Sequence, residues 1–262
     1  MINLVIPMAG KGQRFLDAGY KDPKPFINVA GKMMIERVLD NLALECNHQT
    51  TLIAQKKFLS EHPKKIEFIE SKYNCKFFLI DEHTNGTACT LLLAQEIYAT
   101  EEPLLIANCD QIVETNINDF VLGALSGKAD GSIMTFIEES MDNKWSYVKT
   151  DQNDFITEAK EKKAISNHAT VGIYLFSSGN HFIKSAKEMI EKEDSVNGEF
   201  YTCPIYNYYL REKPRITEHI IKREQMHGIG TPEDLEQLKK DGLVIGHMCP
   251  VEGPPNKACC NP

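Results

Sequence analysis

The sequence has no run of about 18 apolar residues, the length that a helix needs to cross a bilayer. Residues 1–7 also lack the basic segment and the long apolar segment of a signal peptide. The 29 Lys and Arg residues are outnumbered by 37 Asp and Glu, so the formal net charge is -8. This balance disfavours a broad basic surface for nucleic acid. We therefore expect a cytoplasmic protein with neither nucleic acid nor a membrane as its partner.

Paired cysteine motifs are also missing, because none of the eight cysteines forms a C-x-x-C pair. Three of them belong to residues 246–262, a proline-containing tract that predicts an irregular tail, and their spacing matches no standard zinc pattern. The other cysteines lie in segments with the pattern of core strands and helices, where free buried thiols in a reducing compartment are expected. They are Cys46, Cys75, Cys89, Cys109 and Cys203.

Short apolar runs alternate with longer amphipathic stretches, as a sheet covered by helices requires. Nearly continuous apolar runs predict strands buried on both faces, and these runs are residues 2–7, 50–55, 75–81 and 103–109. Helical spacing of apolar residues predicts helices between them, at residues 33–44, 57–71 and 87–99. The first part of the chain is therefore predicted to be an open α/β sheet.

Beyond residue 110 the pattern changes to strands with few helices between them, which predicts a mixed or antiparallel extension of the sheet. The strands are expected at residues 130–138, 145–151, 154–162 and 169–176. Two helices, at residues 178–191 and 199–211, and a strand at residues 216–224 are expected to follow. Thr231 is a good N-cap and Pro232 suits the first helical position, so a last helix should begin there.

The segment after the first strand is where an open α/β sheet binds ligands. It reads PMAGKGQRF, and its two glycines, Gly10 and Gly12, allow the backbone to approach a polyanion closely. Lys11 and Arg14 add positive charge, so the loop predicts a phosphate cradle, although a glycine-rich turn with solvated cations explains the same residues. It is neither a Walker loop nor a dinucleotide fingerprint, because Phe15 stands in place of the third glycine.

Two charged residues follow in positions that suit a phosphate and a metal ion. Lys24 lies between Pro23 and Pro25, which fix the backbone and present a single ammonium group. Asp110 follows the strand predicted at residues 103–109, where its carboxylate can hold Mg²⁺ together with phosphates and water. A structural loop is the alternative for Lys24, and a turn cap is the alternative for Asp110.

Taken together, in this order and spacing, these features resemble the sugar-phosphate nucleotidylyltransferases, the pyrophosphorylase family. The resemblance extends from Ile2 to about Leu238 and is strongest in PMAGKGQRF and PKP. It implies an α/β fold with a Rossmann-like mixed sheet flanked by helices, as in GT-A-like nucleotidyltransferases, and an acceptor-side β extension. We expect one domain over residues 1–245, with a nucleotide-binding half at residues 1–125 and an acceptor-binding half at residues 126–245.

The resemblance also implies roles for individual residues of the first half. Arg14 and Lys24 would be catalytic and contact phosphates, and Asp110 would be both catalytic and a ligand of Mg²⁺. For residues 84–87, for which the resemblance implies contacts with the nucleotide, an ordinary helix N-cap with a loop glycine is an equally good explanation. The residues implied to bind the nucleotide are Met8, Ala9, Gly10, Gly12, Thr84, Gly86, Thr87 and Asn108.

Acceptor binding is implied for residues of the second half, which are Glu161, Lys162, Gly172, Asn197 and Glu199. Lys162 would meet the acceptor phosphate and Glu161 a hydroxyl or amine of its organic part, whereas the default for a charged run such as KEKK is a solvated face. One departure leaves the second metal ligand open. Many family members have a metal-binding aspartate where this chain has Gly228.

The implied reaction transfers an NMP group from a nucleoside triphosphate to a phosphomonoester and releases pyrophosphate. A pyrimidine nucleotide (CTP, UTP or dTTP) is favoured as the donor and a sugar 1-phosphate as the acceptor. A role in capsule or surface-polysaccharide synthesis is implied by the resemblance alone. Because a phosphate monoester has a second pKa near ~6, it needs no general base at neutral pH. Phosphocholine or a phosphorylated amide such as phosphoglutamine is an alternative acceptor. Two alternative functions are a GT-A glycosyltransferase and a non-catalytic nucleotide sensor. A homo-oligomer is a further expectation.

Overall fold

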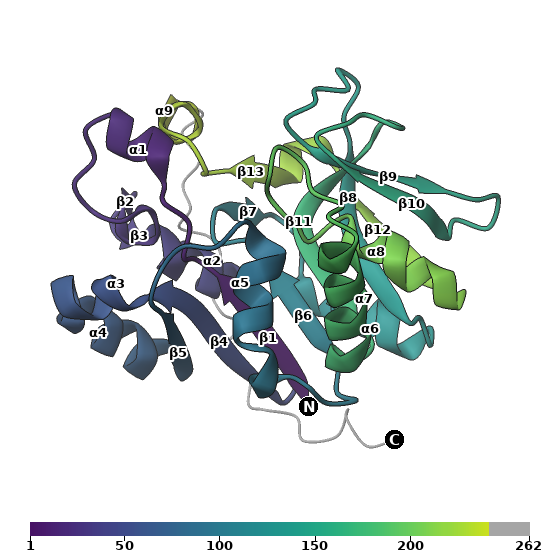
Figure 1. The fold of residues 1–262 in the computed structure, drawn as a ribbon. Helices are drawn as coiled ribbons and strands as arrows, with labels where there is room; N and C mark the ends of the chain where they lie inside the picture. Colours follow the sequence, from purple (N-terminus) through teal and green to yellow (C-terminus); the bar gives the residue numbers. More distant parts are fainter. Residues whose placement is uncertain (241–262) are drawn as a thin grey trace.

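The computed structural model describes residues 1–240, except for the side chain of Lys239, and contains a nine-stranded sheet with helices on both faces (Figure 1). The strand order is β10-β9-β11-β6-β1-β4-β5, with β8 paired to β11 and β12 paired to β8. The nine strands are β1 (Ile2–Pro7), β4 (His48–Gln55), β5 (Cys75–Ile80), β6 (Leu104–Ala107), β8 (Gly131–Ile137), β9 (Ser146–Thr150), β10 (Ile156–Glu161), β11 (His168–Phe176) and β12 (Ile216–Ile221).

The direction of the strands changes between the two parts of this sheet. Strands β1, β4, β5 and β6 pair in parallel. Strand β11 runs antiparallel to β6, β8 and β9, and β9 runs antiparallel to β10. The predicted mixed sheet with a β extension after residue 110 is therefore confirmed.

Alternating side chains of the central strands enter two hydrophobic cores, one on each face of the sheet. Leu4 and Ile6 of β1 belong to one core, and Val5 between them belongs to the other. In β6 the same alternation separates Leu105 from Ile106. Successive side chains of a strand point to opposite faces, so a strand covered on both sides must be apolar throughout.

Helices α2 and α6 contribute to the first core, and helices α5, α7 and α8 to the second; α5 and α7 lie in front of the sheet in Figure 1. The helices of residues 1–240 are α1 (Gln13–Asp17), α2 (Met34–Asn41), α3 (Lys56–Glu61), α4 (Pro63–Tyr73), α5 (Thr87–Leu93), α6 (Ile117–Ser126), α7 (Gly179–Glu191), α8 (Ile205–Tyr209) and α9 (Pro232–Lys240). Short 3₁₀ turns are η1 (Lys24–Phe26), η2 (Gln95–Ile97), η3 (Leu210–Glu212) and η4 (Arg223–Gln225).

Proline accounts for two errors in the predicted helices. The helix expected at residues 57–71 is two helices, because α3 ends at Glu61 and Pro63 begins α4. The helix expected at residues 199–211 begins only after Pro204. Proline has no N–H and clashes with the preceding helical turn, so it is tolerated where a helix begins and not in its interior.

Three other predicted elements end early. The helices expected at residues 33–44 and 87–99 end at Asn41 and Leu93. The strand expected at residues 216–224 ends at Ile221, because residues 223–225 form the turn η4. After both helices the apolar pattern continues into residues that pack on the core without α-helical geometry, whereas residues 222–224 after the strand are charged and exposed.

The strand pair β7 (Gln111–Val113) and β13 (Met226–Gly228) was not predicted, nor were α6 and the hairpin of β2 (Asn28–Val29) and β3 (Lys32–Met33). Strand β13 lies in a stretch that the sequence presents as a loop. Its pairing with β7 brings residues near 228 beside residues near 110. This small sheet therefore joins a late segment of the chain to the edge where β6 ends.

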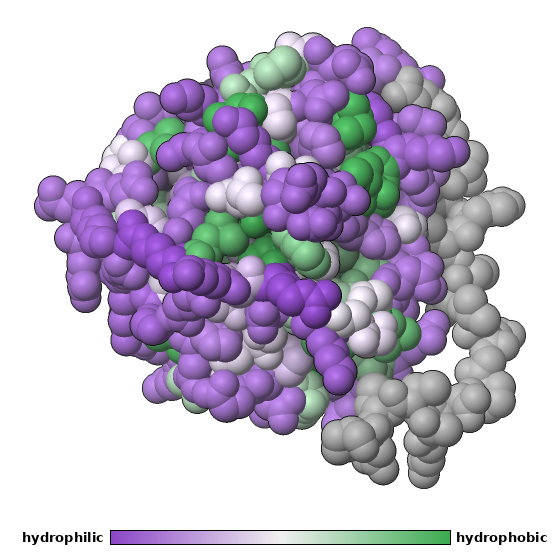
Figure 2. All heavy atoms as spheres, turned by 90° about the vertical axis from the view of Figure 1, so that its right-hand side faces the viewer, coloured by the Kyte–Doolittle hydropathy of each residue, from purple (hydrophilic) through white to green (hydrophobic). Residues whose placement is uncertain are grey.

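Cys75, Cys89, Cys109 and Cys203 are free thiols, as predicted, and Cys46 and Cys89 are only half-buried. The predicted tail at residues 246–262 lies outside the described residues. Within residues 1–240, no helix is both long and apolar enough to span a bilayer. From the right-hand side of Figure 1 the surface is mainly hydrophilic, with small separate hydrophobic areas (Figure 2).

Candidate active site

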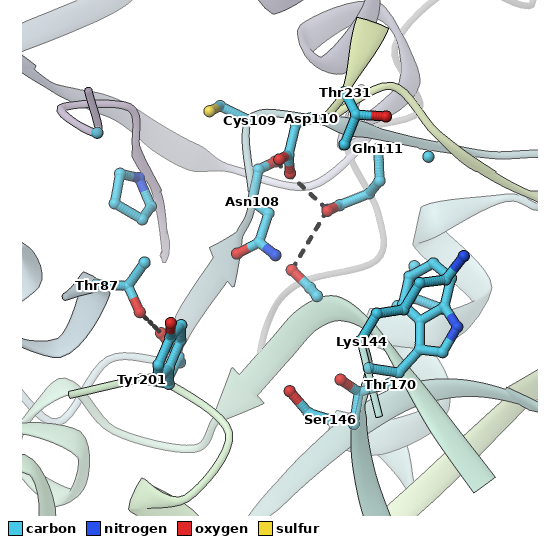
Figure 3. Close-up of a pocket in the computed structure, with 18 of the residues that line it drawn as sticks. Thr87, Asn108, Cys109, Asp110, Gln111, Lys144, Ser146, Thr170, Tyr201 and Thr231 are labelled. Atoms are coloured by element: carbon cyan, nitrogen blue, oxygen red, sulfur yellow. Dashed lines mark hydrogen bonds between the residues drawn. The ribbon is translucent and has the colours of Figure 1, made fainter. Parts of the chain in front are cut away.

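A cavity of about 670 Å³ opens at the carboxyl ends of β1 and β6. It is lined by residues from both halves of the chain, and Figure 3 shows their side chains around it. Eleven of the predicted site residues line this cavity, namely Met8, Gly10, Gly12, Arg14, Lys24, Thr87, Asn108, Asp110, Glu161, Lys162 and Gly172.

The glycine loop follows β1 directly and is tied to β4. The backbone N–H of Met8 donates to the carbonyl of Ile53 at 2.8 Å, and the amide of Gln55 donates to the carbonyl of Ala9 at 2.5 Å. Gly12 has a φ of 64°, and a Cβ atom there would lie 3.0 Å from the Cβ of Lys24. A glycine at this position therefore lets the loop pass close over Lys24, as no larger residue could without a shift.

Lys24 and Asp110 form an ion pair inside the cavity, with Lys24 Nζ 2.5 Å from Asp110 Oδ2. Their side chains are only 19% and 28% exposed. Burial disfavours the ammonium form of Lys24, but the attraction of Asp110 outweighs this effect and raises the pKa of Lys24. The ammonium group of Lys24 is thus a charged donor that can exchange its contact with Asp110 for a contact with an incoming anion.

Cys109 lies between two of the predicted site residues but is chemically inert. Its buried thiol has a pKa raised to about 12, because burial disfavours the thiolate. A thiol in this state is a poor nucleophile and a poor metal ligand. The polar groups that β6 delivers to the cavity are therefore those of Asn108 and Asp110.

Gly172 lies where β11 passes closest to the end of β6. Its φ is 94°, and a Cβ atom there would lie 2.4 Å from the side-chain nitrogen of Asn108. The backbone N–H of Asn108 donates to the carbonyl of Gly172 at 2.9 Å. The register of β11 against β8 shifts at this point, as in a β-bulge that re-aims a side chain.

We expect the substitution Gly172→Ala to lower the free energy of unfolding by about 3 kcal/mol, because a positive φ and a clash with Asn108 both oppose the added methyl group. Gly198→Ala is the matched control. Gly198 also has a positive φ of 78°, but nothing lies within 4 Å of the added Cβ, so its cost should be about 1 kcal/mol. Urea unfolding measures both values, and equal costs would show that the contact with Asn108 is unimportant.

Glu161 and Lys162 reach the cavity from the end of β10. Lys162 has a φ of 50°, and its backbone N–H donates to the carbonyl of Trp145 at 3.0 Å. Its ammonium group donates to the hydroxyl of Tyr201 and lies 4.4 Å from the centre of the Tyr201 ring. The hydroxyl of Ser146 donates to Glu161. This side of the cavity therefore offers a cation beside a carboxylate.

Burial raises the pKa of Glu161, although Ser146 and Lys162 favour its carboxylate form. A raised folded-state pKa means that folding binds a proton to Glu161 at intermediate pH, so the ionised group opposes folding above that pKa. We expect Glu161→Gln to stabilise the protein at neutral pH and to lose this gain as the pH falls toward the unfolded-state pKa. Glu158→Gln serves as the control, because Glu158 lies on the same strand and pairs with Lys149 at 3.4 Å.

Urea unfolding of both variants at neutral and acid pH measures this effect. A Glu161→Gln protein that is no more stable than the parent at neutral pH would contradict the reasoning. Stability sacrificed at a buried charge is typical of residues kept for function.

Five predicted site residues do not line the cavity, and these are Ala9, Thr84, Gly86, Asn197 and Glu199. The Thr84 hydroxyl donates to the carbonyl of Gly86 at 2.9 Å. A Cβ atom on Gly86 would lie 2.4 Å from the carbonyl oxygen of Phe200, so this glycine accommodates a neighbouring loop. Asn197 and Glu199 are exposed. Their roles in binding stay predictions.

Several lining residues were not predicted from the sequence. They share no local motif, and most come from the segments around residues 145, 202 and 230. No constraint of the kind that glycine or proline imposes marks Trp145 or Tyr201 in the sequence. The main additions are Lys144, Trp145, Ser146, Thr170, Tyr174, Tyr201, Thr202, Gly228, Gly230, Thr231, Glu233 and Asp234.

The donors at Asp110 fit Mg²⁺ in character. Mg²⁺ takes one or two carboxylates from a protein and completes its shell with phosphate oxygens and water. Asp110 supplies such a carboxylate at the edge of a cavity that also holds Arg14 and Lys24. Within residues 1–240, no group of three or more His, Cys, Asp or Glu side chains is placed to hold a metal ion by itself.

The cavity at this sheet edge gathers cations from two halves of an acidic chain. A family model described as "Nucleotidyl transferase" matches residues 4–242. The chain therefore belongs to the nucleotidyl transferase family.

Two curated relatives from archaea are similar over most of this chain. The bifunctional protein GlmU of Methanocaldococcus jannaschii is 26% identical over 255 residues, which cover 91% of this chain and 54% of that protein. The bifunctional protein GlmU of Methanococcus maripaludis is 26% identical over 204 residues, covering 74% of this chain and 46% of that protein. The chain spans about half the length of these relatives.

Two solved structures share the fold. The nucleoside-diphosphate-sugar pyrophosphorylase from Vibrio cholerae RC9 has a TM-score of 0.77 at 23% identity, covering 90% of this chain and 99% of that one. A UDP-glucose pyrophosphorylase complexed with UDP-glucose has a TM-score of 0.75 at 16% identity, covering 92% of this chain and 98% of that one. The predicted Rossmann-like nucleotidyltransferase fold is confirmed.

Proposed function

We propose that this protein is an Mg²⁺-dependent enzyme that transfers a nucleotidyl group from a nucleoside triphosphate to a phosphomonoester and releases pyrophosphate. The observation that carries the proposal is one cavity that is lined by Arg14, Lys24 and Asp110 together with Lys162. In a chain with a net charge of -8, these cations form a local exception. Such an arrangement suits a reaction between two anions.

In this reaction an oxygen of the acceptor phosphate attacks the α-phosphorus, a new P–O bond forms and the bond to the pyrophosphate oxygen breaks. Repulsion between the anions is the main barrier, so charge neutralisation and positioning carry catalysis. Arg14 stabilises the departing pyrophosphate, Lys24 moves from Asp110 to the α-phosphate, and Lys162 holds the acceptor phosphate. When bound at Asp110, Mg²⁺ supplies further charge neutralisation at the phosphates.

We propose a sugar 1-phosphate as the acceptor and a pyrimidine nucleotide as the donor. The names of the two structural neighbours, a nucleoside-diphosphate-sugar pyrophosphorylase and a UDP-glucose pyrophosphorylase, support this choice. In this proposal Glu161 binds a hydroxyl group of the sugar, next to Lys162 at its phosphate. We place the reaction in the cytoplasm and propose a surface polysaccharide as the destination of the sugar.

A non-sugar phosphate with a cationic headgroup, such as phosphocholine, is a second candidate acceptor. Aromatic faces bind cations when they are within about 6 Å. Two aromatic rings of this cavity already contact lysines of the protein in this way. Lys144 Nζ lies 4.9 Å from the ring centre of Trp145. Lys162 Nζ lies 4.4 Å from the ring centre of Tyr201. These rings could receive a choline group in the same way.

Incubation with Mg²⁺, each of CTP, UTP, dTTP, ATP and GTP, and a panel of phosphomonoesters tests the proposal. The panel contains sugar 1-phosphates, phosphocholine and a phosphorylated amide. We expect pyrophosphate in at least one mixture, which identifies donor and acceptor together. Nucleoside diphosphate release from a nucleotide sugar would instead indicate a glycosyltransferase. Tight triphosphate binding without any turnover would indicate a nucleotide sensor.

A further inference from the structure

Asp234 is one of four carboxylates that line the cavity, together with Asp110, Glu161 and Glu233. It lies in the first turn of α9, where its backbone N–H donates to the hydroxyl of Thr231 at 3.1 Å. None of the ion pairs within residues 1–240 involves Asp234. Its negative charge therefore faces the cavity without a cationic partner in the described part of the chain.

Residues 228–230 pass beside both Asp110 and Asp234. The N–H of Ile229 donates to the carbonyl of Asp110 at 2.9 Å, which fixes this stretch beside the end of β6. A Cβ atom on Gly230 would lie 2.7 Å from Asp110 Oδ2, and one on Gly228 would lie 3.7 Å from Asp234 Oδ2. Because residues 228 and 230 are glycines, no side chain stands beside the carboxylate of Asp234 at the first position or beside that of Asp110 at the second.

The two glycines differ in what they permit. At Gly230 an added methyl group would displace the carboxylate of Asp110. At Gly228 the nearest atom to an added Cβ is the carboxylate of Asp234, at an ordinary contact distance of 3.7 Å. Space for a side chain is therefore available at Gly228, and the group already beside that space is an oxygen donor.

We propose that Asp234 is the second carboxylate of the Mg²⁺ site and takes the place of the side chain that is missing at Gly228. This inference rests on the proposed function. Mg²⁺ bound through two carboxylates is within its usual coordination by proteins. Asp110 becomes available when Lys24 transfers to a phosphate, and Asp234 needs no such release.

Binding of Mn²⁺ in the presence of inorganic pyrophosphate tests this assignment without any turnover. Relaxation of water protons reports Mn²⁺ on the slowly tumbling protein and separates it from small pyrophosphate complexes. We expect Asp234→Asn to weaken Mn²⁺ binding about tenfold or more, as loss of groups at metal sites does. Asp119→Asn is the matched control, since Asp119 is an exposed aspartate in the first turn of another helix, α6, and does not line the cavity, and it should bind within about twofold of the parent.

The double variant Gly228→Asp/Asp234→Asn tests the location. It should regain most of the lost Mn²⁺ affinity, because the new carboxylate occupies the space next to residue 234. A double variant that binds no better than Asp234→Asn would contradict a shared location. Circular dichroism of each variant establishes that it is folded.

The outcomes distinguish a failure of the role of Asp234 from a failure of the proposed function. If the parent binds Mn²⁺ and Asp234→Asn binds it equally well, the role of Asp234 is refuted and the proposed function stands. If neither the parent nor Asp110→Asn shows bound Mn²⁺, the Mg²⁺ site of the proposed function is itself refuted.

Discussion

Replacement of Asp110 by asparagine is expected to lower kcat/KM by about 10³-fold, the effect of several kcal/mol of lost charge stabilisation at a metal site. Asparagine has nearly the same shape, so the change removes charge with little change in packing. Asp110 is also the partner of Lys24 at 2.5 Å. Its loss therefore weakens the hold on the metal and removes the anion that keeps Lys24 in position.

Asp22→Asn is the control for this experiment. Asp22 is two residues from Lys24 and pairs with Lys65 at 2.7 Å, at the surface and outside the cavity. We expect its kcat/KM to stay within about twofold of the parent, because exposed ion pairs contribute little. Steady-state rates at several Mg²⁺ concentrations measure both variants. Equal activity of Asp110→Asn and the parent would exclude Asp110 from catalysis.

Replacement of Arg14 by alanine should lower kcat by about 10²-fold, as does removal of one donor that stabilises charge in a transition state. Arg14 is exposed in α1, directly after the glycine loop, and lines the cavity. The fold should therefore be unchanged, which thermal unfolding can verify. The expected loss falls on kcat, because the charge on pyrophosphate increases as the bond breaks.

Lys11→Ala is the charge-matched control for Arg14. Lys11 is exposed in the glycine loop but does not line the cavity. A loss of net positive charge alone would affect both variants equally, whereas a specific contact affects only Arg14→Ala. If the two variants turned over alike, Arg14 would act through the general field of the loop and not at the leaving group.

The parallel part of the fold was predictable because each of its strands is long and apolar throughout. Strand β1 has the predicted boundaries, and β4 begins two residues earlier than predicted, at His48. Helix α6 was missed although Ile117, Phe120 and Val121 have helical spacing and are buried. Strands β7 and β13 have three residues each, too few to show a period of two.

Several of the predicted residues that line the cavity are marked in the sequence by a local backbone constraint. PMAGKGQRF and PKP owe their pattern to glycine and proline, whose conformational limits are written in the sequence. Trp145 and Tyr201 have no such mark, since they meet Lys162 only after three separate segments pack together. Asp234 has the sequence context of an ordinary residue in a capped helical turn, so its place beside Gly228 required the structure.

The central claim is that one cavity joins a nucleotide to a second phosphate. The most direct measurement follows phosphorus NMR signals during incubation of the protein with Mg²⁺, the triphosphate and the acceptor from the active mixture. We predict that pyrophosphate and a new diphosphate diester appear together in a 1:1 ratio while the acceptor monoester disappears. Nucleoside diphosphate with inorganic phosphate, or pyrophosphate without the diester, would contradict nucleotidyl transfer.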